Sequence, residues 1–251
     1  MEKYQDVNAK AISRWIKEGW EWGKPISHED YLKAKNGECH VKLTPTKDVP
    51  ASWFLPFKNL KILGLASGGG QQMPVFAALG ADVTVFDYND DQLASEALVS
   101  NREGYKINII KGDMSKPLPF EDSSFDLIFF PVSNVYVEEA KPIFKEAYRI
   151  LKKNGRLLSG LDNGINFITN NDEKEICHSL PFNPLKDEKL YEEMMNDDDG
   201  VEFSHTLEEQ IGGQLEAGFI LKEIYEDTND EGRLHELNIP SFFATLAIKP
   251  L

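Results

Sequence analysis

A glycine-rich segment carries the strongest chemical signal in this chain of 251 residues. It reads GLASGGGQQ from Gly64 to Gln72. The consecutive glycines Gly68, Gly69 and Gly70 permit positive φ angles and have no side chains to keep a ligand from the backbone. The helix expected from about Gln71 begins with unpaired, electropositive amides that suit a carboxylate or a phosphate. The segment predicts close approach of a ligand; the alternative is a turn that only lets a strand and a helix pack.

Two acidic residues follow the next two apolar runs. Asp87 ends the run DVTVFD, 19 residues beyond Gly68, where a carboxylate of a βαβ unit can accept hydrogen bonds from two ribose hydroxyls. Asp113 follows the run INIIKG, where it can accept from an adenine amine while Met114 and Tyr88 supply apolar faces. Each acid alone is more often a cap or turn residue. In series after parallel strands, they favour a nucleoside site at the carboxyl ends of a sheet.

Short apolar runs alternate with helical patterns from about Leu60 to Leu161, which is typical of βαβ units and a parallel sheet. The runs predict an α/β fold with strands at 61–66, 82–87, 107–113, 125–131, 156–161, 219–226 and 242–248. Helices are expected from about Gln71 and over about 90–104, 140–151 and 207–216.

Two segments lie outside this alternation. Residues 1–58, which include Trp15, Trp20 and Trp22, predict an N-terminal helical cap. Residues 163–205 are too long for a structureless loop and predict a lid or substrate insertion with some helix of its own. Residues 59–162 then form the cofactor-binding core and 206–251 the C-terminal part of the same sheet. The tryptophans either fix the cap to the core or line a pocket for an apolar or cationic acceptor.

The composition restricts the partners. With 27 Lys and Arg against 42 Asp and Glu, the net charge is −15, which argues against a nucleic-acid substrate. The start MEKYQDVNAK does not read as a secretion signal, and no apolar run approaches the roughly 18 residues of a membrane span. We expect a cytoplasmic protein. Cys39 and Cys177 are the only cysteines, so neither a disulfide framework nor a metal site is expected.

These motifs, in this order, resemble the class I S-adenosylmethionine-dependent methyltransferases, in particular the type 11 methyltransferase domain. The resemblance covers about residues 58–161 and, more loosely, 206–251. It implies a Rossmann-like, doubly wound sheet of seven strands, mostly parallel with an antiparallel last strand. It also implies S-adenosyl-L-methionine as cofactor and S-adenosyl-L-homocysteine as product.

The resemblance assigns cofactor binding to residues at the ends of the first four strands. Gly64 replaces the family's usual acid and Ala66 its first glycine, so Gln71 or Gln72 can substitute in holding the amino group of the cofactor. The implied cofactor-binding set is Gly64, Ala66, Ser67, Gly68, Gly69, Gly70, Gln71, Gln72, Asp87, Tyr88, Asn89, Gly112, Asp113, Met114, Pro131 and Val132.

Methyl transfer from a sulfonium is an in-line displacement whose leaving group needs no acid, so alignment can supply most of the acceleration. A base helps where the nucleophile must lose a proton. The candidates are Tyr136 and Asp162, after the fourth and fifth strands, and His178 and His205 in the insertion. The alternatives are that Tyr136 packs beside the cofactor, that Asp162 caps a turn, and that the histidines are exposed loop residues.

Two other functions are compatible with parts of the pattern. A nicotinamide dinucleotide needs G-x-G-x-x-G, and the string from Gly68 to Met73 lacks the last glycine. An oxidoreductase is therefore the less favoured reading, and a non-catalytic S-adenosylmethionine-binding protein is the third. The string from Pro131 to Asn134 differs from the Asn/Asp-Pro-Pro-aromatic motif of enzymes that methylate amino groups of nucleic acids and proteins, which favours a small-molecule acceptor. The attacking atom and the oligomeric state stay open at this point.

Overall fold

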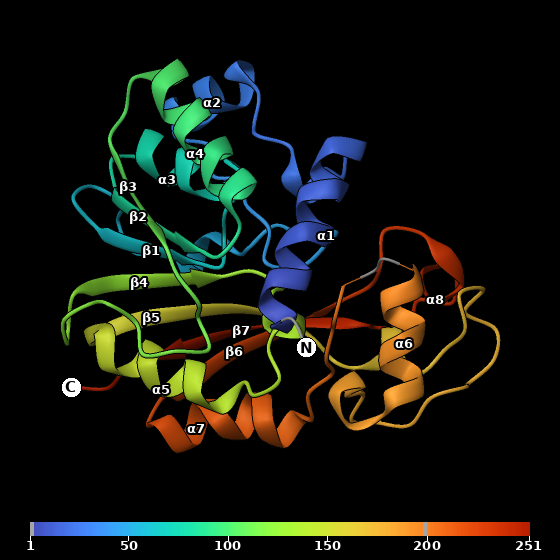
Figure 1. Cartoon of the computed structure of the whole chain (residues 1–251). Coiled ribbons are helices and arrows are strands. Elements are labelled where there is room, and N and C mark those ends of the chain that lie inside the picture. Colours follow the sequence, from blue (N-terminus) through green and yellow to red (C-terminus); the bar gives the residue numbers. More distant parts are fainter. Residues whose placement is uncertain (1–2, 198–199) are drawn as a thin grey trace.

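The computed structural model describes residues 3–197 and 200–251, and these form a single seven-stranded sheet with helices on both faces (Figure 1). The strand order is β3-β2-β1-β4-β5-β7-β6. The strands are β1 (Lys61–Leu65), β2 (Asp82–Asp87), β3 (Ile107–Lys111), β4 (Phe125–Phe130), β5 (Leu151–Asp162), β6 (Ile220–Asp227) and β7 (Phe242–Ile248). β1 to β5 pair in parallel, and β7 runs antiparallel to β5 and β6. The expected fold class is confirmed.

The strand order identifies the edge of the sheet at which a ligand can bind. From β1 the chain moves outward to β2 and β3, and then returns to place β4 and β5 on the other side of β1. Ligands of such sheets bind beyond the carboxyl ends of the strands, where the order reverses. The residues that follow β1, β2, β3 and β4, and the last residue of β5, meet at that edge.

Apolar side chains on both faces of the strands explain the two helical layers. One face packs against α5 (Lys141–Ile150) and α7 (Gly213–Ala217), and the other against α2 (His28–Lys35), α3 (Gln72–Ala78) and α4 (Asp90–Glu103) (Figure 1). In α5, Ile143, Phe144, Ala147 and Ile150 recur at helical spacing and are all buried. The helix alternation predicted from the sequence is therefore the one observed.

Three features of the secondary structure differ from the prediction. β5 begins at Leu151, which pairs with Phe125 of β4, although Lys152 to Gly155 look like a helix end. Pairing with a neighbouring strand outweighs that local signal. The helix expected at 207–216 is a π-helix (Glu208–Gly212) followed by α7, and the last two strands are joined through α8 (Gly232–Glu236).

The N-terminal segment is helical in part. It contains α1 (Tyr4–Glu18), α2 and two 3₁₀ turns (Glu21–Gly23 and Ala51–Trp53), but residues 36–50 are irregular. Val41, Leu43 and Val49 of that stretch lie in the core against the sheet. This stretch therefore contributes side chains to the core, and the boundary of the cap stays a prediction.

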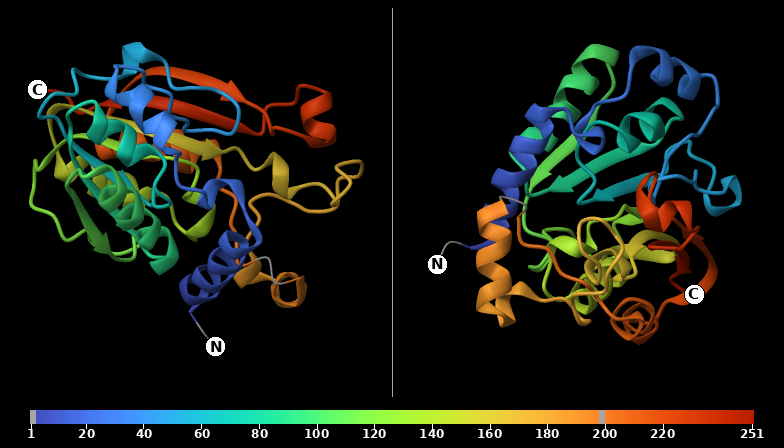
Figure 2. Two further views of the ribbon diagram at one scale, coloured as in Figure 1. Left: turned by 90° about the horizontal axis from the view of Figure 1, so that it is seen from above. Right: turned by 90° about the vertical axis from the view of Figure 1, so that its right-hand side faces the viewer.

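The insertion after β5 contains two 3₁₀ turns (Ile165–Phe167 and Pro184–Lys186) and α6 (Glu188–Asp197); Asp198 and Asp199 lie outside the described residues. α1 and α6 lie side by side near the carboxyl edge of the sheet (Figure 2). Val7 packs with Val201 and Phe203, and Asn8 exchanges two hydrogen bonds with the backbone of Val201, at 2.9 and 2.6 Å. The two segments that flank the core are thus in direct contact. None of the helices in the described part of the chain is both long and apolar enough to cross a membrane.

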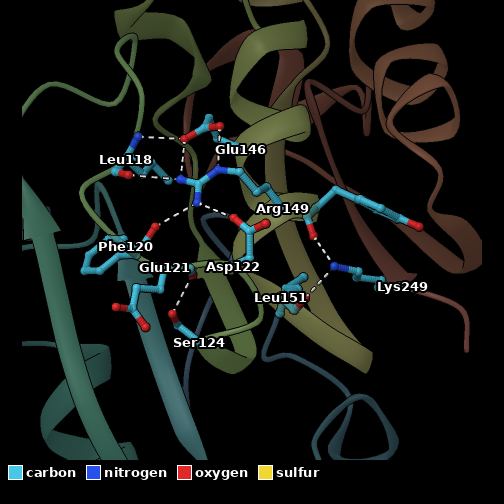
Figure 3. Close-up of polar contacts among 10 residues, drawn as sticks. Leu118, Phe120, Glu121, Asp122, Ser124, Glu146, Arg149, Leu151 and Lys249 are labelled. Atoms are coloured by element: carbon cyan, nitrogen blue, oxygen red, sulfur yellow. Dashed lines mark hydrogen bonds and ion pairs between the residues drawn. The ribbon is translucent and has the colours of Figure 1, made fainter.

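An arginine on α5 fixes the connection between β3 and β4 (Figure 3). The Arg149 guanidinium donates to the carbonyl oxygens of Leu118 and Phe120, at 3.0 and 2.7 Å, and pairs with Glu146 and Asp122. The hydrogen bond from Arg149 lowers the pKa of Glu146. This clamp holds the segment that begins with Gly112 and Asp113.

Candidate functional site

A cavity of about 1140 Å³ lies at the carboxyl edge of the sheet. Most residues that the sequence assigns to the site line it. They are Ala66, Ser67, Gly68, Gln71, Gln72, Asp87, Tyr88, Asn89, Gly112, Asp113, Met114, Pro131 and Val132, together with Tyr136, Asp162 and His178. Gly64, Gly69, Gly70 and His205 are outside the lining. The further walls come from the N-terminal segment and the insertion.

Steric contacts with α4 explain the glycines of the loop after β1. A Cβ on Gly68 would lie 2.6 Å from Cβ of Gln92 and 3.0 Å from Oδ2 of Asp87. Gly70 has a φ of +70°, and a Cβ there would lie 2.9 Å from the carbonyl oxygen of Ser95. Of the three glycines, Gly68 alone lines the cavity; Gly69 and Gly70 serve the packing of the loop on the helix. The cofactor-binding role expected of all three glycines stays a prediction.

Gly64 is buried in β1 and faces α3. A Cβ at this position would meet the sulfur and the methyl group of Met73 at 2.9 Å. The Met73 side chain therefore occupies the space next to the position where the family's usual acid would stand. Gly64 does not line the cavity, and its cofactor-binding role stays a prediction.

Asp87 joins the end of β2 to the glycine loop. Its Oδ2 accepts from the amide of Gly68 at 3.0 Å, and its Oδ1 accepts from the amide of Asn89 at 2.9 Å. The side-chain oxygen of Asn89 in turn accepts from the amide of Gln92 and caps α4. Burial raises the pKa of the Asp87 carboxyl. Each carboxylate oxygen has further acceptor capacity, so Asp87 can also receive hydroxyl groups from a ligand in the cavity.

Helix α1 lies over the end of the cavity that Asp87 and Asp113 line. Tyr88 donates to Asp6 at 2.5 Å, and the side-chain Nδ2 of Asn89 donates to the carbonyl oxygen of Ala9 at 2.7 Å. Gln5 Nε2 lies 3.4 Å from Oδ2 of Asp113. No local pattern in the sequence indicated this contact, because it joins residues about 80 or more positions apart.

The residues at this end fit an adenosine group. Two carboxylates, Asp87 and Asp113, follow neighbouring parallel strands, and Met114 and Tyr88 supply apolar surface between them. At the other side of the loop, Ser67 donates to the side-chain oxygen of Gln72 at 3.1 Å, and both line the cavity. The Gln71 amide is instead bonded to the carbonyl oxygens of residues 21 and 24. Gln72 is therefore the better placed substitute for the missing acid.

Asp162, at the end of β5, is a buried carboxylate in the cavity wall, only 3% exposed. Its Oδ1 accepts from the amide of Gly164 at 2.6 Å and its Oδ2 from Asn166 at 2.7 Å. Desolvation raises its pKa to about 6, against the effect of both hydrogen bonds. Asp162 thus forms the turn that the sequence allowed and also presents a carboxylate that is ready to take a proton near neutral pH.

A buried polar network fixes Asp162 from behind. Asn134 Oδ1 accepts from the amide of Asp162 at 3.2 Å, and Asn134 donates to Gln210 at 3.1 Å. Gln210 donates to the carbonyl oxygens of Asp162 and His205, both at 2.9 Å. Gln210 lies in the π-helix, a form often found at functional sites. Sequence analysis did not single out Asn134 or Gln210 as members of such a network, since no motif marks them.

The structure changes the interpretation of three candidates for a base. His205 is 3% exposed and its Nε2 lies 2.9 Å from the carbonyl oxygen of Asn134, so it belongs to the buried network and does not reach the cavity. His178 lines the cavity, half-buried and edge-on to Phe182 at 5.6 Å, rather than exposed in a loop. Burial raises the pKa of Tyr136 well above its ordinary value, so its hydroxyl stays protonated. Asp162 is the strongest of the four candidates.

Comparison with known proteins agrees with this geometry. Residues 63–159 match the model of the family described as "Methyltransferase domain". The chain is 41% identical over 249 residues to the uncharacterized methyltransferase YbaJ of Bacillus subtilis, covering 96% of this chain and 97% of that protein. The chain belongs to the class I S-adenosylmethionine-dependent methyltransferases. A sterol 24-C-methyltransferase of Aspergillus fumigatus is 29% identical over 101 residues, 39% of this chain and 26% of that one.

The solved structures give the same fold. An S-adenosylmethionine-dependent methyltransferase from Mesorhizobium loti superposes with a TM-score of 0.61 at 17% identity, over 78% of this chain and 94% of that one. With the methyltransferase class established, the oxidoreductase reading is set aside.

The cavity has a larger lining than the residues that the sequence assigns to the site. Its remaining walls are mostly apolar and come from the flanking segments. They include Ile12, Trp15, Trp20, Trp22 and Pro45 from the N-terminal segment, Phe167, Phe182, Leu190 and Met194 from the insertion, and Phe242 from β7. This half of the cavity is the space available to an acceptor.

Proposed function

We propose that this methyltransferase transfers the methyl group of S-adenosylmethionine to a small-molecule acceptor by in-line displacement. The observation that carries the proposal is one continuous cavity that has Asp87 and Asp113 at one end and Asp162 with an apolar wall at the other. Its volume of about 1140 Å³ exceeds the roughly 300–1,000 Å³ of an ordinary ligand pocket, and supports a cofactor and an acceptor bound together.

Asp87, Asp113, Met114 and the loop from Ala66 to Gly68 would hold the nucleoside, with Ser67 and Gln72 near the amino acid portion. When bound, S-adenosylmethionine supplies an electrophilic methyl group whose sulfur leaves as a neutral thioether. The protein's own task is then to orient the acceptor and to exclude water, because alignment alone can supply a large share of the acceleration.

The walls of the cavity explain how water is excluded. α1 reaches across from the nucleoside end to the insertion, where Asn8 is bonded to the backbone of Val201 and Tyr4 packs edge-on against Phe203 at 5.2 Å. We propose that residues 1–58 and 163–205 act together as walls and lid of the acceptor site. Such a cover must open for exchange and close for reaction.

A small acceptor also agrees with the charge of the protein. A net charge of −15 opposes the approach of nucleic acid, and a cover formed by α1 and the insertion restricts the size of what can reach the cofactor.

The test uses methyl-labelled S-adenosylmethionine and a cell extract separated by ultrafiltration into small molecules and macromolecules. We expect label to be transferred to the small-molecule fraction by the native protein and much less by Asp87→Ala. Label transferred to protein or nucleic acid would contradict the acceptor class. Absence of any transfer, in a protein that still binds S-adenosylhomocysteine, would favour a non-catalytic role.

A further inference from the structure

We propose that the acceptor of this methyltransferase is an apolar amine whose nitrogen lies against Asp162 and whose body lies against the aromatic wall of the cavity. This inference rests on the proposed function and names the substrate class of the same site. Three observations on the wall of the cavity and the chemistry of the transfer support it.

The first observation is the position of Asp162. It is the cross-strand partner of Phe242 in the β5–β7 pair, and Phe242 also lines the cavity. The hydrogen bonds from Gly164 and Asn166 use one acceptor site on each carboxylate oxygen. A carboxylate oxygen has about two such sites, so Asp162 retains capacity for an N–H donor in the cavity. The network through Asn134 and Gln210 holds the backbone of Asp162 in place.

The second observation is the aromatic surface beside it. Trp22, Pro45 and Phe242 line both this cavity and a smaller adjoining one, so the three lie together at that end. Elsewhere in the lining of the same cavity, Trp15 and Trp20 form a tilted pair with ring centroids 5.5 Å apart. Aromatic faces attract cations as well as apolar groups, and tryptophan does so most strongly.

The third observation is the charge of the lining. Among the described residues of the wall, Lys42 is the only lysine or arginine, and its Nζ is bonded to the carbonyl oxygen of Pro45 at 3.2 Å. The carboxylates in the same wall are Glu18, Asp87, Asp113, Asp162 and Glu202. A carboxylate or phosphate on the acceptor would lose its hydration with little cationic compensation. The wall therefore selects against anionic acceptors.

The chemistry of the transfer is the fourth argument. The amine binds as an ammonium ion and first gives a proton to a carboxylate oxygen of Asp162, which frees the nitrogen lone pair. Above about pH 6 that carboxyl is ionised and able to accept the proton. The lone pair then forms the bond to the methyl carbon while the carbon–sulfur bond breaks and leaves its electron pair on sulfur, so the positive charge of the sulfonium ends on the methylated nitrogen. The proton balance thus closes within the cavity.

The test measures binding of three probes with one skeleton by titration calorimetry, on the full chain saturated with S-adenosylhomocysteine. The probes are 2-(2-naphthyl)ethylamine, 2-(2-naphthyl)ethanol and 2-naphthylacetate. We expect the amine to bind at least about tenfold more tightly than the alcohol, and the carboxylate most weakly. Equal affinities, a preference for the alcohol or the carboxylate, or no heat from the amine would overturn the proposal.

Asp162→Asn is the direct variant and Glu18→Gln the matched control, since Glu18 is another carboxylate of the same wall. We expect Asp162→Asn to lose the preference for the amine over the alcohol and Glu18→Gln to keep it. Retention of the preference in Asp162→Asn, or an equal loss in both variants, would contradict the role of Asp162. Thermal unfolding establishes first that each variant is folded.

A measurement on the native protein does not depend on any variant. We expect the affinity for the amine to fall as the pH is lowered through about 6, because Asp162 gains a proton. Burial also raises the pKa of Asp87, and the raised pKa values of Tyr88 and Tyr136 keep their hydroxyls protonated. The remaining titratable groups of the cavity wall are Glu18, Lys42, Asp113, His178 and Glu202. The amine titration is therefore repeated in His178→Asn, and a pH dependence that disappears there would contradict the assignment. Failure of S-adenosylhomocysteine itself to bind would instead refute the proposed function.

Discussion

A buried glutamate beneath the glycine loop provides a quantitative test of the structure. Glu96 of α4 is fully buried, and its Oε1 accepts from the amide of Gly70 at 2.9 Å. Within the described chain, its Oε2 has no hydrogen-bond partner, and neither has Oε1 of Gln92 one turn earlier. Gln92 and Glu96 are four apart on the helix and are therefore neighbours. A proton on Oε2 of Glu96 can be donated to Oε1 of Gln92, which gives both oxygens a hydrogen-bond partner. We therefore expect Glu96 to be held in its neutral form.

The size of the expected change in stability follows from the pKa of Glu96. Desolvation raises the pKa of Glu96 to about 8 from an ordinary 4.5, despite the Gly70 hydrogen bond and with a further contribution from the nearby charge of Asp87. The folded state thus binds this proton more tightly than the unfolded state, so its contribution to stability is complete at low pH and is lost as the pH rises towards 8. At about 1.4 kcal/mol per pH unit, the loss between about pH 5 and about pH 9 is about 4 kcal/mol.

The perturbation is Glu96→Gln, which keeps an acceptor for Gly70 and a donor for Gln92 but cannot ionise. The free energy of unfolding is measured by urea denaturation at about pH 5 and at about pH 9. We expect its decrease over that range to be about 4 kcal/mol smaller in the variant than in the native protein. Asp162 titrates in both proteins and cancels in the difference. In melting temperature, the effect corresponds to roughly 10 °C. Parallel pH profiles of the two proteins would refute the reasoning.

Three further outcomes are expected. Asp87→Ala should weaken S-adenosylhomocysteine binding by about 2–3 kcal/mol in calorimetry and leave the domain folded; collapse of the ligand-free variant would show that the residue is mainly structural. Arg149→Met should lower the free energy of unfolding by about 2–3 kcal/mol. The control Arg233→Met removes one exposed ion pair with Glu236 and should lower it by less than about 1 kcal/mol. Equal losses of stability in the two variants would contradict the clamp. Amide exchange in 163–197 should slow when S-adenosylhomocysteine and an acceptor are both bound, with little change in β1 and β4; equal protection with and without ligands would exclude a lid.

Local patterns in the sequence account for most of the fold. The alternation of apolar runs and helical repeats predicted the strands within a few residues, because strands buried on both faces must be continuously apolar. The exceptions are places where tertiary contacts override a local signal. Lys152 to Gly155 carry a helix-end pattern, yet β5 begins before them at Leu151, which pairs with Phe125 of β4.

The candidate site could be predicted only for residues whose type suits the chemistry and whose position is at the end of a strand. Asp87, Asp113 and Asp162 each follow or end a parallel strand, so topology alone brings them to one edge. Gln210 and the residues of α1 come to the site from distant parts of the chain, and no residue pattern announces such contacts. His205 illustrates the converse: its residue type indicated chemistry, while its burial against Asn134 makes it structural.

The central claim is that the cavity binds S-adenosylmethionine through Asp87 and the glycine loop, and titration calorimetry tests it most directly. We expect S-adenosylhomocysteine to bind the native protein with one site per chain and to bind Asp87→Ala much more weakly, and we expect no heat from NAD. Heat from NAD together with none from S-adenosylhomocysteine would contradict the account.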